Sequence, residues 1–259
     1  MEYNPGLDIK VDEENMLFLY GEETFGPEVE KRYLDDIRKS LRDPKTFGPE
    51  VPYAIAMDIG KKKDLIDLKD RSLLYGAVIY SKGKLGEEPV RSQGHVHAVS
   101  ASCGSSTPEV YEIWKGEAII FMQDTAKDDL RKCFAVYAEA GEVVVVPPKW
   151  AHYTVNANPH EAMVFGAWCI RDYGFEYDDV LAHGGLAYFP VLEENNKISW
   201  KKNETYNPPS IVIRNARVYS EFGLEKGVPI YTQYEKNKNL FNFVTKPETV
   251  KNIWLKFEP

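Results

Sequence analysis

The sequence predicts an all-β fold: an antiparallel sandwich or barrel over residues 70–190, with an extension on each side. Two observations support this. Apolar residues recur with a period of two in several short runs, and turns marked by Gly and Pro separate those runs. The chain has 259 residues, 43% of them hydrophobic, and is long enough to bury one sizeable core. We therefore expect an N-terminal extension (1–69), a barrel (70–190) and a C-terminal extension (191–259).

The N-terminal extension is expected to contain one amphipathic helix. Charged residues surround an apolar stripe that recurs every four positions: Val29, Tyr33, Ile37 and Leu41. This spacing predicts a helix from about Glu28 to Arg42. Asp43 and Pro44 should end it, because the residue before a proline disfavours the helical conformation.

The barrel strands are expected to begin with residues 73–81, which read as a buried strand. Three segments then repeat a strand, turn, strand plan: residues 109–124, 132–148 and 154–170. Gly116 and Gly141 mark the turns of the first two.

The C-terminal extension is expected to hold a strand within residues 211–219 and a short helix within 246–257, with Pro247 in its first turn. These pieces are too short to build a second core. We expect them to be arms packed on the barrel or on a second subunit.

Composition disfavours several classes of partner. The net charge of −8 disfavours nucleic acid and anionic membranes, because both need a basic face. No apolar run approaches the roughly 20 residues that a membrane-spanning helix needs. The N-terminus lacks the pattern of a secretion signal, and the three cysteines are widely spaced. We therefore expect a cytoplasmic protein with buried, reduced thiols.

One constellation points to chemistry. His95 and His97 stand two apart, so on an extended segment both imidazoles share a face. Glu109 opens the next strand, with Tyr111 on the same face, and His152 precedes the last strands. Imidazole and carboxylate ligands suit Fe²⁺, Mn²⁺, Ni²⁺ or Zn²⁺. A His-x-His pair alone is a weak signal, but the full pattern is specific, so we predict a divalent metal site on these three histidines and Glu109.

These residues lie in two blocks that resemble the paired motifs of the cupin superfamily, whose fold is a double-stranded β-helix or jelly-roll barrel. The first block keeps His-x-His, Glu and Gly, and the second keeps Gly, Pro, His and Asn: His95, His97, Glu109, Gly116, Gly141, Pro147, His152 and Asn156. Two departures stand out. The gap before Glu109 is lengthened by SASCGSSTP, which we expect to form a loop over the site, and Lys149 replaces a motif glycine.

Within cupins the chain resembles the glucose-6-phosphate isomerase family of archaea and some bacteria. The segments GHVHA, EVYEIWKG, VVVVPPKWAHYTVN and DYGFEYDDVLAHGG carry this resemblance over about residues 75–190. It implies an aldose–ketose isomerase of glycolysis and gluconeogenesis, with iron or another divalent metal as cofactor and a homodimeric assembly. Tyr111 and Tyr177 would line the sugar pocket, with Glu109 as the candidate base. A metal-assisted hydride shift, which needs no base, remains the alternative route.

The phosphate subsite is the part of the resemblance with the weakest match. Family threonines on the strand before the histidines are replaced by Gly76 and Ala77, which leaves Ser92 and the backbone at Gly94 as expected donors. Arg91 and Lys149 are further candidates. Three other functions stay open: a metal-dependent cupin dioxygenase, a sugar-phosphate-binding cupin without turnover, and an isomerase of another hexose phosphate such as mannose 6-phosphate.

Overall fold

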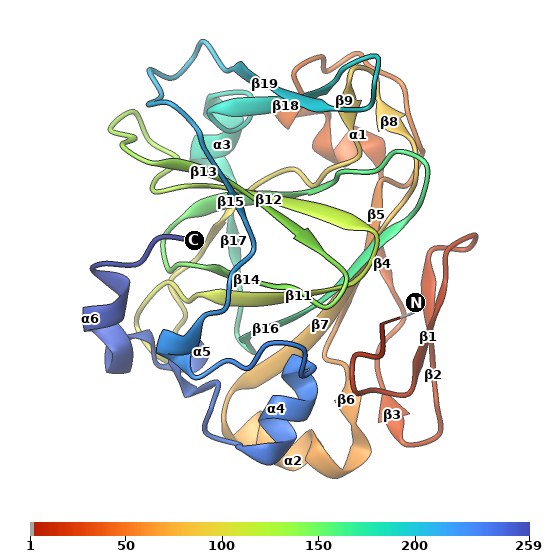
Figure 1. Cartoon of the computed structure of the whole chain (residues 1–259), viewed down its shortest axis with the longest axis vertical. Coiled ribbons are helices and arrows are strands. Elements are labelled where there is room, and N and C mark those ends of the chain that lie inside the picture. Colours follow the sequence, from red (N-terminus) through yellow and green to blue (C-terminus); the bar gives the residue numbers. More distant parts are fainter. Residues whose placement is uncertain (1–2) are drawn as a thin grey trace.

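The computed structural model describes residues 3–259 and shows two β-sheets that face each other to form a barrel (Figure 1). The six-stranded sheet has the order β14-β11-β16-β7-β5-β4, and the four-stranded sheet has the order β15-β12-β13-β20. Pairs within these sheets are antiparallel, except that β13 and β20 run parallel. The strands of the six-stranded sheet are β4 (Glu30–Arg32), β5 (Tyr53–Met57), β7 (Leu73–Tyr80), β11 (Glu109–Lys115), β14 (Val143–Val146) and β16 (Met163–Ile170). Those of the four-stranded sheet are β12 (Glu117–Gln123), β13 (Cys133–Glu139), β15 (Ala151–Asn156) and β20 (Val212–Asn215).

Shorter elements surround the barrel. The two-stranded pairs are β1 (Ile9–Asp12) with β2 (Leu17–Tyr20), β3 (Thr24–Phe25) with β6 (Gly60–Lys61), β8 (Lys84–Leu85) with β9 (Glu88–Pro89), β10 (Val96–His97) with β17 (Phe175–Glu176), and β18 (Tyr188–Leu192) with β19 (Ile198–Lys202). The α-helices are α1 (Leu34–Ile37), α2 (Leu65–Asp70), α3 (Asp178–Ala182), α4 (Ile230–Lys236), α5 (Asn242–Thr245) and α6 (Lys251–Trp254). Turns of 3₁₀-helix occupy Arg38–Ser40, Lys62–Asp64, Ser220–Phe222 and Pro247–Val250.

The path of the chain through the two sheets is that of a jelly roll. From β11 to β16 the chain passes back and forth between the sheets, with β12, β13 and β15 in the four-stranded sheet. Isolated bridges from Arg91 to Val155 and from His95 to His152 add residues 91–95 beside β15. The barrel therefore has two facing layers. One consists of β7, β16, β11 and β14, and the other consists of residues 91–95, β15, β12 and β13. This arrangement confirms the predicted all-β jelly-roll barrel.

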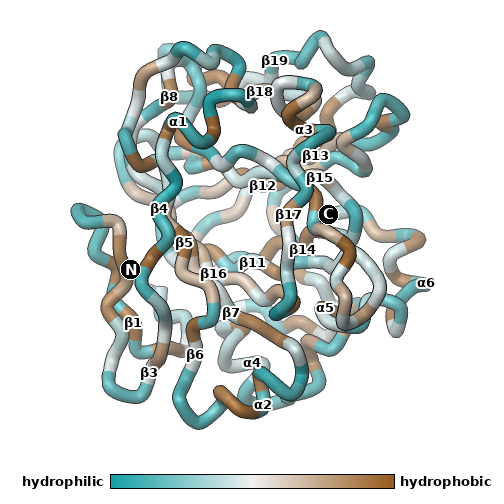
Figure 2. The backbone as a smooth tube through the Cα atoms, turned by 180° about the vertical axis from the view of Figure 1, so that it is seen from behind, coloured by the Kyte–Doolittle hydropathy of each residue, from teal (hydrophilic) through white to brown (hydrophobic). Residues whose placement is uncertain are grey.

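The predicted strand, turn, strand segments are confirmed, and the two strands of each segment lie in opposite sheets. Strand β7 matches the first predicted strand, and the pairs β11–β12, β13–β14 and β15–β16 match the three strand, turn, strand segments. Gly116 (φ 74°) and Gly141 (φ 86°) lie in two of the turns, in the left-handed conformation that glycine adopts without a steric penalty. Figure 2 shows the hydrophobic segments gathered on the sheet strands and the hydrophilic segments on the loops around them.

The predicted helix over residues 28–42 is wrong. Its first part is the edge strand β4, whose residues pair with Tyr53–Ile55 of β5. The helix α1 begins only at Leu34, where the backbone N–H of Tyr33 donates a hydrogen bond of 2.8 Å to the Asp36 carboxylate. Pairing with the free edge of β5 outweighs the local helical preference, because strand pairing satisfies backbone groups that a short exposed helix leaves to water.

Both extensions pack on the barrel. In Figure 1 the C-terminal segment crosses beside β13 as β20 and then reaches α4 and α5 beneath the six-stranded sheet. There Tyr231 and Phe241 join Trp168 and Tyr75 in one buried apolar cluster. The expected terminal helix appears as a 3₁₀ turn from Pro247 followed by α6. The division at residues 70 and 190 stays a prediction, since strands from both flanks join the sheets. Among residues 3–259, no helix is long and apolar enough to cross a membrane.

Candidate metal centre

Two strand segments place the three histidines. The backbone N–H of His95 donates to the carbonyl of His152 at 3.1 Å, and the N–H of His152 donates to the carbonyl of His95 at 3.0 Å. This reciprocal pair fixes the two imidazoles side by side, with ring centroids 4.4 Å apart. His97 lies in β10, and its ring centroid is 5.3 Å from that of His95, so the i, i+2 spacing does place both on one face.

Glu109 reaches the same point from the opposite sheet, as the first residue of β11. Its Oε2 atom lies 3.2 Å from Nε2 of His97 and 3.7 Å from Nε2 of His152. One ligand atom from each of the four residues lies within 4.8 Å of the others. The structure therefore brings together the whole predicted set, hereafter the His₃Glu cluster (His95, His97, Glu109 and His152).

Hydrogen bonds behind the cluster orient two of its imidazoles. Nδ1 of His97 lies 2.8 Å from the carbonyl of Thr107, and Nδ1 of His152 lies 3.3 Å from the carbonyl of Trp150. Because a carbonyl only accepts, each Nδ1 is the donor, and in the neutral imidazole this leaves the lone pair of Nε2 directed at the cluster. The loop that lengthens the first motif supplies Thr107, so it packs behind the site.

The pKa values of the cluster suit metal ligation. Burial lowers the pKa of His95 well below its ordinary value, and the charges of His152 and His97 lower it further. Burial also lowers the pKa of His152. Burial acts to raise the pKa of Glu109, but hydrogen bonds and charges from His152 and His97 hold it well below its usual range. For His97, burial acts to lower the pKa, yet Glu109 raises it overall. His95 and His152 are thus neutral beside an ionised carboxylate, as ligands must be.

An unpartnered atom shows that the cluster fits a metal ion. Nε2 of His95 is buried and has no hydrogen-bond partner among the described residues. A buried polar atom without a partner is destabilising, and a cation bound by the cluster would remove that cost. Three nitrogen donors and one carboxylate oxygen form a set that borderline divalent metals favour. The cluster is therefore able to hold one such ion.

A cavity inside the barrel opens beside the cluster, and both predicted tyrosines line it. The Oη of Tyr111 donates a 2.7 Å hydrogen bond to Oε2 of Glu109 and lies 3.1 Å from Nε2 of His152. Tyr177 stands near His95, with ring centroids 6.1 Å apart, and Phe175 packs on His95 at 4.2 Å. The residues that line this cavity are Arg32, Tyr53, Ile55, Met57, Val78, Tyr80, Ser92, His95, Glu109, Tyr111, His152, Thr154, Phe165, Phe175 and Tyr177.

The predicted phosphate donors have different positions. Ser92 lines the cavity, and its Oγ accepts a 3.0 Å hydrogen bond from the N–H of Thr154. Gly94 is not among the lining residues, and its α-carbon faces Leu186. Arg91 is fully buried in an ion pair with Glu88, where its Nε donates to Oε1 at 2.7 Å, so it is a structural cation.

The exposed turn residue Lys149 also lies outside the cavity lining. His183 stacks on Tyr206 with ring centroids 3.9 Å apart, and it does not line the cavity either. Neither side chain therefore reaches the cavity wall, where Ser92 lies.

Several lining residues with polar groups were not predicted from the sequence, among them Thr154 and Arg32. Thr154 follows His152 by two positions on β15, so the strand period could have identified it. Arg32 comes from β4, which the sequence pattern presented as a helix. Nothing in the pattern connected Arg32 with the histidines.

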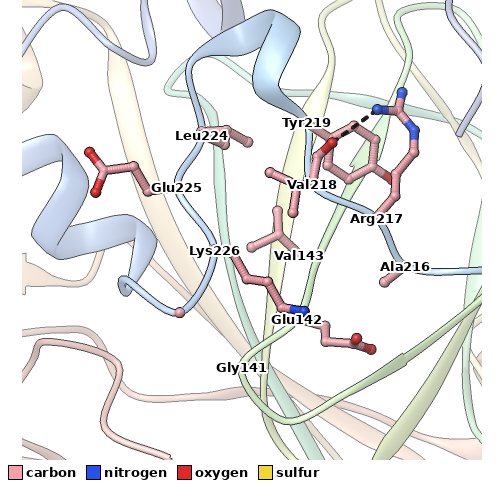
Figure 3. Close-up of a pocket in the computed structure, with 11 residues that line it drawn as sticks. Gly141, Glu142, Val143, Ala216, Arg217, Val218, Tyr219, Leu224, Glu225 and Lys226 are labelled. Carbon is pink, nitrogen blue, oxygen red and sulfur yellow. Dashed lines mark hydrogen bonds between the residues drawn. The ribbon is translucent and has the colours of Figure 1, made fainter.

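A second depression lies on the outside of the barrel, between the β13–β14 turn and the C-terminal extension (Figure 3). Val143, Val218 and Leu224 supply its apolar side chains. Charged residues accompany them, and the Arg217 guanidinium donates to the Val218 carbonyl at 3.2 Å. None of the residues lining this depression belongs to the His₃Glu cluster.

A jelly-roll barrel with a three-histidine, one-carboxylate cluster on its inner face defines this protein as a cupin. The family model described as glucose-6-phosphate isomerase (GPI) matches residues 36–209. The chain therefore belongs to the glucose-6-phosphate isomerase family, a family of isomerases.

Curated relatives agree with this family. The glucose-6-phosphate isomerase of Pyrococcus furiosus is 33% identical over 140 residues, which cover 52% of this chain and 68% of that protein. That of Thermococcus litoralis is 31% identical over 135 residues, covering 52% and 65%. A putative glucose-6-phosphate isomerase of Rhizobium meliloti is 28% identical over 154 residues, covering 60% and 65%. The matches thus span about two thirds of these relatives.

Solved structures resemble the chain only weakly. A recombinant oxalate oxidase in complex with glycolate is 15% identical, with a TM-score of 0.35 over 48% of this chain and 54% of that chain. The Fe(II) form of HppE is 12% identical, with a TM-score of 0.34 over 62% of each chain. Likeness at this level bears on neither activity nor substrate.

Proposed function

We propose that this protein is a metal-dependent glucose-6-phosphate isomerase that interconverts glucose 6-phosphate and fructose 6-phosphate in glycolysis and gluconeogenesis. The His₃Glu cluster, set in the cavity of a chain that belongs to this isomerase family, carries the proposal. In it, His95, His97, Glu109 and His152 hold one divalent ion, either Fe²⁺, Mn²⁺, Ni²⁺ or Zn²⁺. We also propose that the enzyme is cytoplasmic and forms a homodimer.

In the proposed reaction, Glu109 moves a proton between C1 and C2 of the sugar. When bound, the metal supplies Lewis acidity to the sugar oxygens. The described contacts of the Glu109 carboxylate fall on Oε2, which receives the Tyr111 hydrogen bond and faces the histidines. We therefore assign Oε2 to the cluster and Oε1 to the proton, because ligation and proton abstraction compete at a single oxygen.

The tyrosines position the sugar. Burial and the charge of Glu109 raise the pKa of Tyr111 well above its ordinary value, so its hydroxyl keeps its proton and acts as a donor at neutral pH. Tyr177 and Phe175 line the same cavity near His95, where they exclude water from the reacting carbons.

The test loads the metal-free protein with each of the four metals and measures conversion of fructose 6-phosphate to glucose 6-phosphate, with mannose 6-phosphate assayed in parallel. We expect turnover with at least one metal. His152→Ala should abolish both metal binding and turnover, whereas His160→Ala, at an exposed turn histidine, should change neither. Absence of conversion with every metal contradicts the proposal. In that case, oxygen consumption would favour a dioxygenase, and binding without turnover would favour a sugar-phosphate-binding cupin.

A second measurement separates the two chemical routes. When fructose 6-phosphate is converted in D₂O, proton transfer through Glu109 places solvent deuterium at C2 of the product, because the abstracted proton exchanges with solvent. A hydride shift leaves C2 free of deuterium. Mass spectrometry of the product distinguishes the two outcomes.

A further inference from the structure

The cavity contains one cation that takes no part in the chemistry proposed at the His₃Glu cluster. Of the 15 residues lining it, Arg32 is the only lysine or arginine. It lies on the edge strand β4, opposite Tyr53 of β5, and Tyr53 in turn lies opposite Tyr80 of β7. The rings of Tyr53 and Tyr80 stack at 5.2 Å. Arg32, Tyr53 and Tyr80 thus form one row across the six-stranded sheet that faces the cavity.

This row lies away from the His₃Glu cluster. Tyr111, which touches the cluster, pairs with Ala167 of β16, and Ala167 pairs with Gly76 of β7. Tyr111 and Gly76 therefore lie at the same height in the sheet. Tyr80 is four residues further along β7, about 13 Å at the rise of a strand. On the facing sheet, Ser92 and Thr154 line the cavity beyond His152, with Thr154 two residues along β15.

The charge of Arg32 acts within the cavity. Burial raises the pKa of Tyr53 and of Tyr177, and the Arg32 charge opposes the rise in both. The ion-pair partner of Arg32 is Glu30, whose side chain is 66% exposed against 26% for Arg32. A solvent-screened pair of this kind contributes little to stability, so it does not tie the guanidinium away from a stronger anion.

A phosphate monoester matches these donors. It carries close to two negative charges, and a guanidinium binds it through two parallel N–H bonds. Hydroxyl groups of Ser92 and Thr154 would complete the set. A hexose phosphate with C1 and C2 at the His₃Glu cluster must extend its phosphate along the cavity, toward this row.

We propose that Arg32, together with Ser92 and Thr154, binds the phosphate group of the substrate, an inference that rests on the proposed isomerase function. Residue 32 lies outside residues 36–209, which the family model matches, so the match assigns no role to Arg32. Arg32 is a binding residue: it sets affinity for the phosphorylated sugar and leaves the chemistry at C1 and C2 to the cluster.

The test compares Arg32→Ala and Arg32→Lys with Lys31→Ala. Lys31 is the exposed neighbour on the same strand and is a matched control. With fructose 6-phosphate we expect Arg32→Ala to raise KM by about 10- to 100-fold, the effect of losing a charge-assisted hydrogen bond, while kcat changes by no more than about threefold. The KM of Arg32→Lys should lie between those of the wild type and Arg32→Ala, because lysine keeps the charge but cannot form two parallel hydrogen bonds. Lys31→Ala should match the wild type.

A binding measurement keeps the inference separate from turnover. Calorimetric titration of the metal-free protein with inorganic phosphate should give binding in the wild type and in Lys31→Ala, and a loss of binding in Arg32→Ala. Equal KM and equal phosphate affinity in the wild type and Arg32→Ala would overturn the assignment. If the wild type shows no isomerisation with any metal, the proposed function fails, and phosphate titration still decides whether Arg32 binds phosphate.

Discussion

Two carboxyl groups on β11 point to opposite faces of the sheet and have opposite electrostatic surroundings. Glu109 faces the cavity among imidazoles that keep it ionised. Glu112 faces outward beneath the extensions, where its Oε1 accepts hydrogen bonds from the Tyr3 hydroxyl at 2.7 Å and from the Ile230 N–H at 2.8 Å. Its Oε2 has no partner among the described residues. Alternation along one strand thus separates the carboxylate of the His₃Glu cluster from a structural one.

Glu109→Gln should keep the fold and lose turnover. Glutamine is similar in shape but cannot take up a proton, so we expect kcat to fall by about 10²- to 10⁴-fold. The measurement is kcat at saturating fructose 6-phosphate, with metal content determined on the same sample. Full activity in a metal-loaded Glu109→Gln protein would remove Glu109 from proton transfer.

Glu112 should make stability depend on pH. Burial raises the pKa of Glu112 to about 7, from its ordinary value of 4.5. Since the unfolded chain ionises first, stability should decrease as pH rises from about 4.5 to about 7, by about 3 kcal/mol, and then level off. Glu112→Gln has no ionisation and should lack this component. Denaturant unfolding at pH 5 and pH 8 measures it, and an unchanged pH dependence in the variant would exclude Glu112 as its source.

At the residue scale, the sequence could predict the histidines and Glu109 because strand spacing and motif order specify them. It could not predict Arg32, since its place in the cavity depends on β4 pairing with a strand more than 20 residues away. Gly94 was expected beside the phosphate from its position before the histidines. Its backbone has a φ of 92°, and the structure does not bring it to the cavity wall.

At the element scale, the strand, turn, strand segments and the terminal helix were predictable, whereas the extent of the N-terminal helix was not. Alternating apolar residues and turn glycines are local signals, so they indicate a strand without knowledge of which strand it pairs with. The helix expected over residues 28–42 failed because the competing partner, β5, is distant in sequence. The turn before β15 contains a strained residue. Lys149, at the place of a motif glycine, has a φ of 72°, in the left-handed region.

Lys149→Gly should therefore stabilise the protein. A non-glycine residue in the left-handed region costs about 1 kcal/mol, which glycine avoids. We expect the free energy of unfolding to rise by about that amount, with KM and kcat unchanged. Lys127→Gly, at an exposed position outside the left-handed region, is the matched control and should give no gain. A loss of stability in Lys149→Gly would show that the lysine side chain contributes more than its backbone strain costs.

At the scale of the whole molecule, the C-terminal extension completes the outer face of the barrel. Trp168 of β16 is fully buried, and its ring lies 5.3 Å from that of Tyr231 and 5.4 Å from that of Phe241. The apolar outer face of β7 and β16 needs such a cover. Sequence alone could describe the extension only as arms, because its aromatic residues have no regular period.

Phe241→Ala should test this role in stability. Truncating a fully buried phenylalanine costs about 3–5 kcal/mol, whereas Phe47→Ala should change stability by less than about 0.5 kcal/mol. Phe47 is a suitable control because it is 86% exposed, against 0% for Phe241. Thermal and denaturant unfolding of both variants measures the difference. Equal stability would mean that the extension does not support the barrel.

The reciprocal main-chain bonds between His95 and His152 have a practical consequence for handling the protein. They join two ligand-bearing segments without help from any ion. Chelation should therefore leave the far-ultraviolet circular dichroism spectrum unchanged and lower the melting temperature only through lost ligand binding. A zinc finger unfolds when its metal is removed, whereas this barrel should keep its fold and its cluster geometry without the ion. Different ions can then be exchanged into one stripped preparation at room temperature, with no refolding step between them.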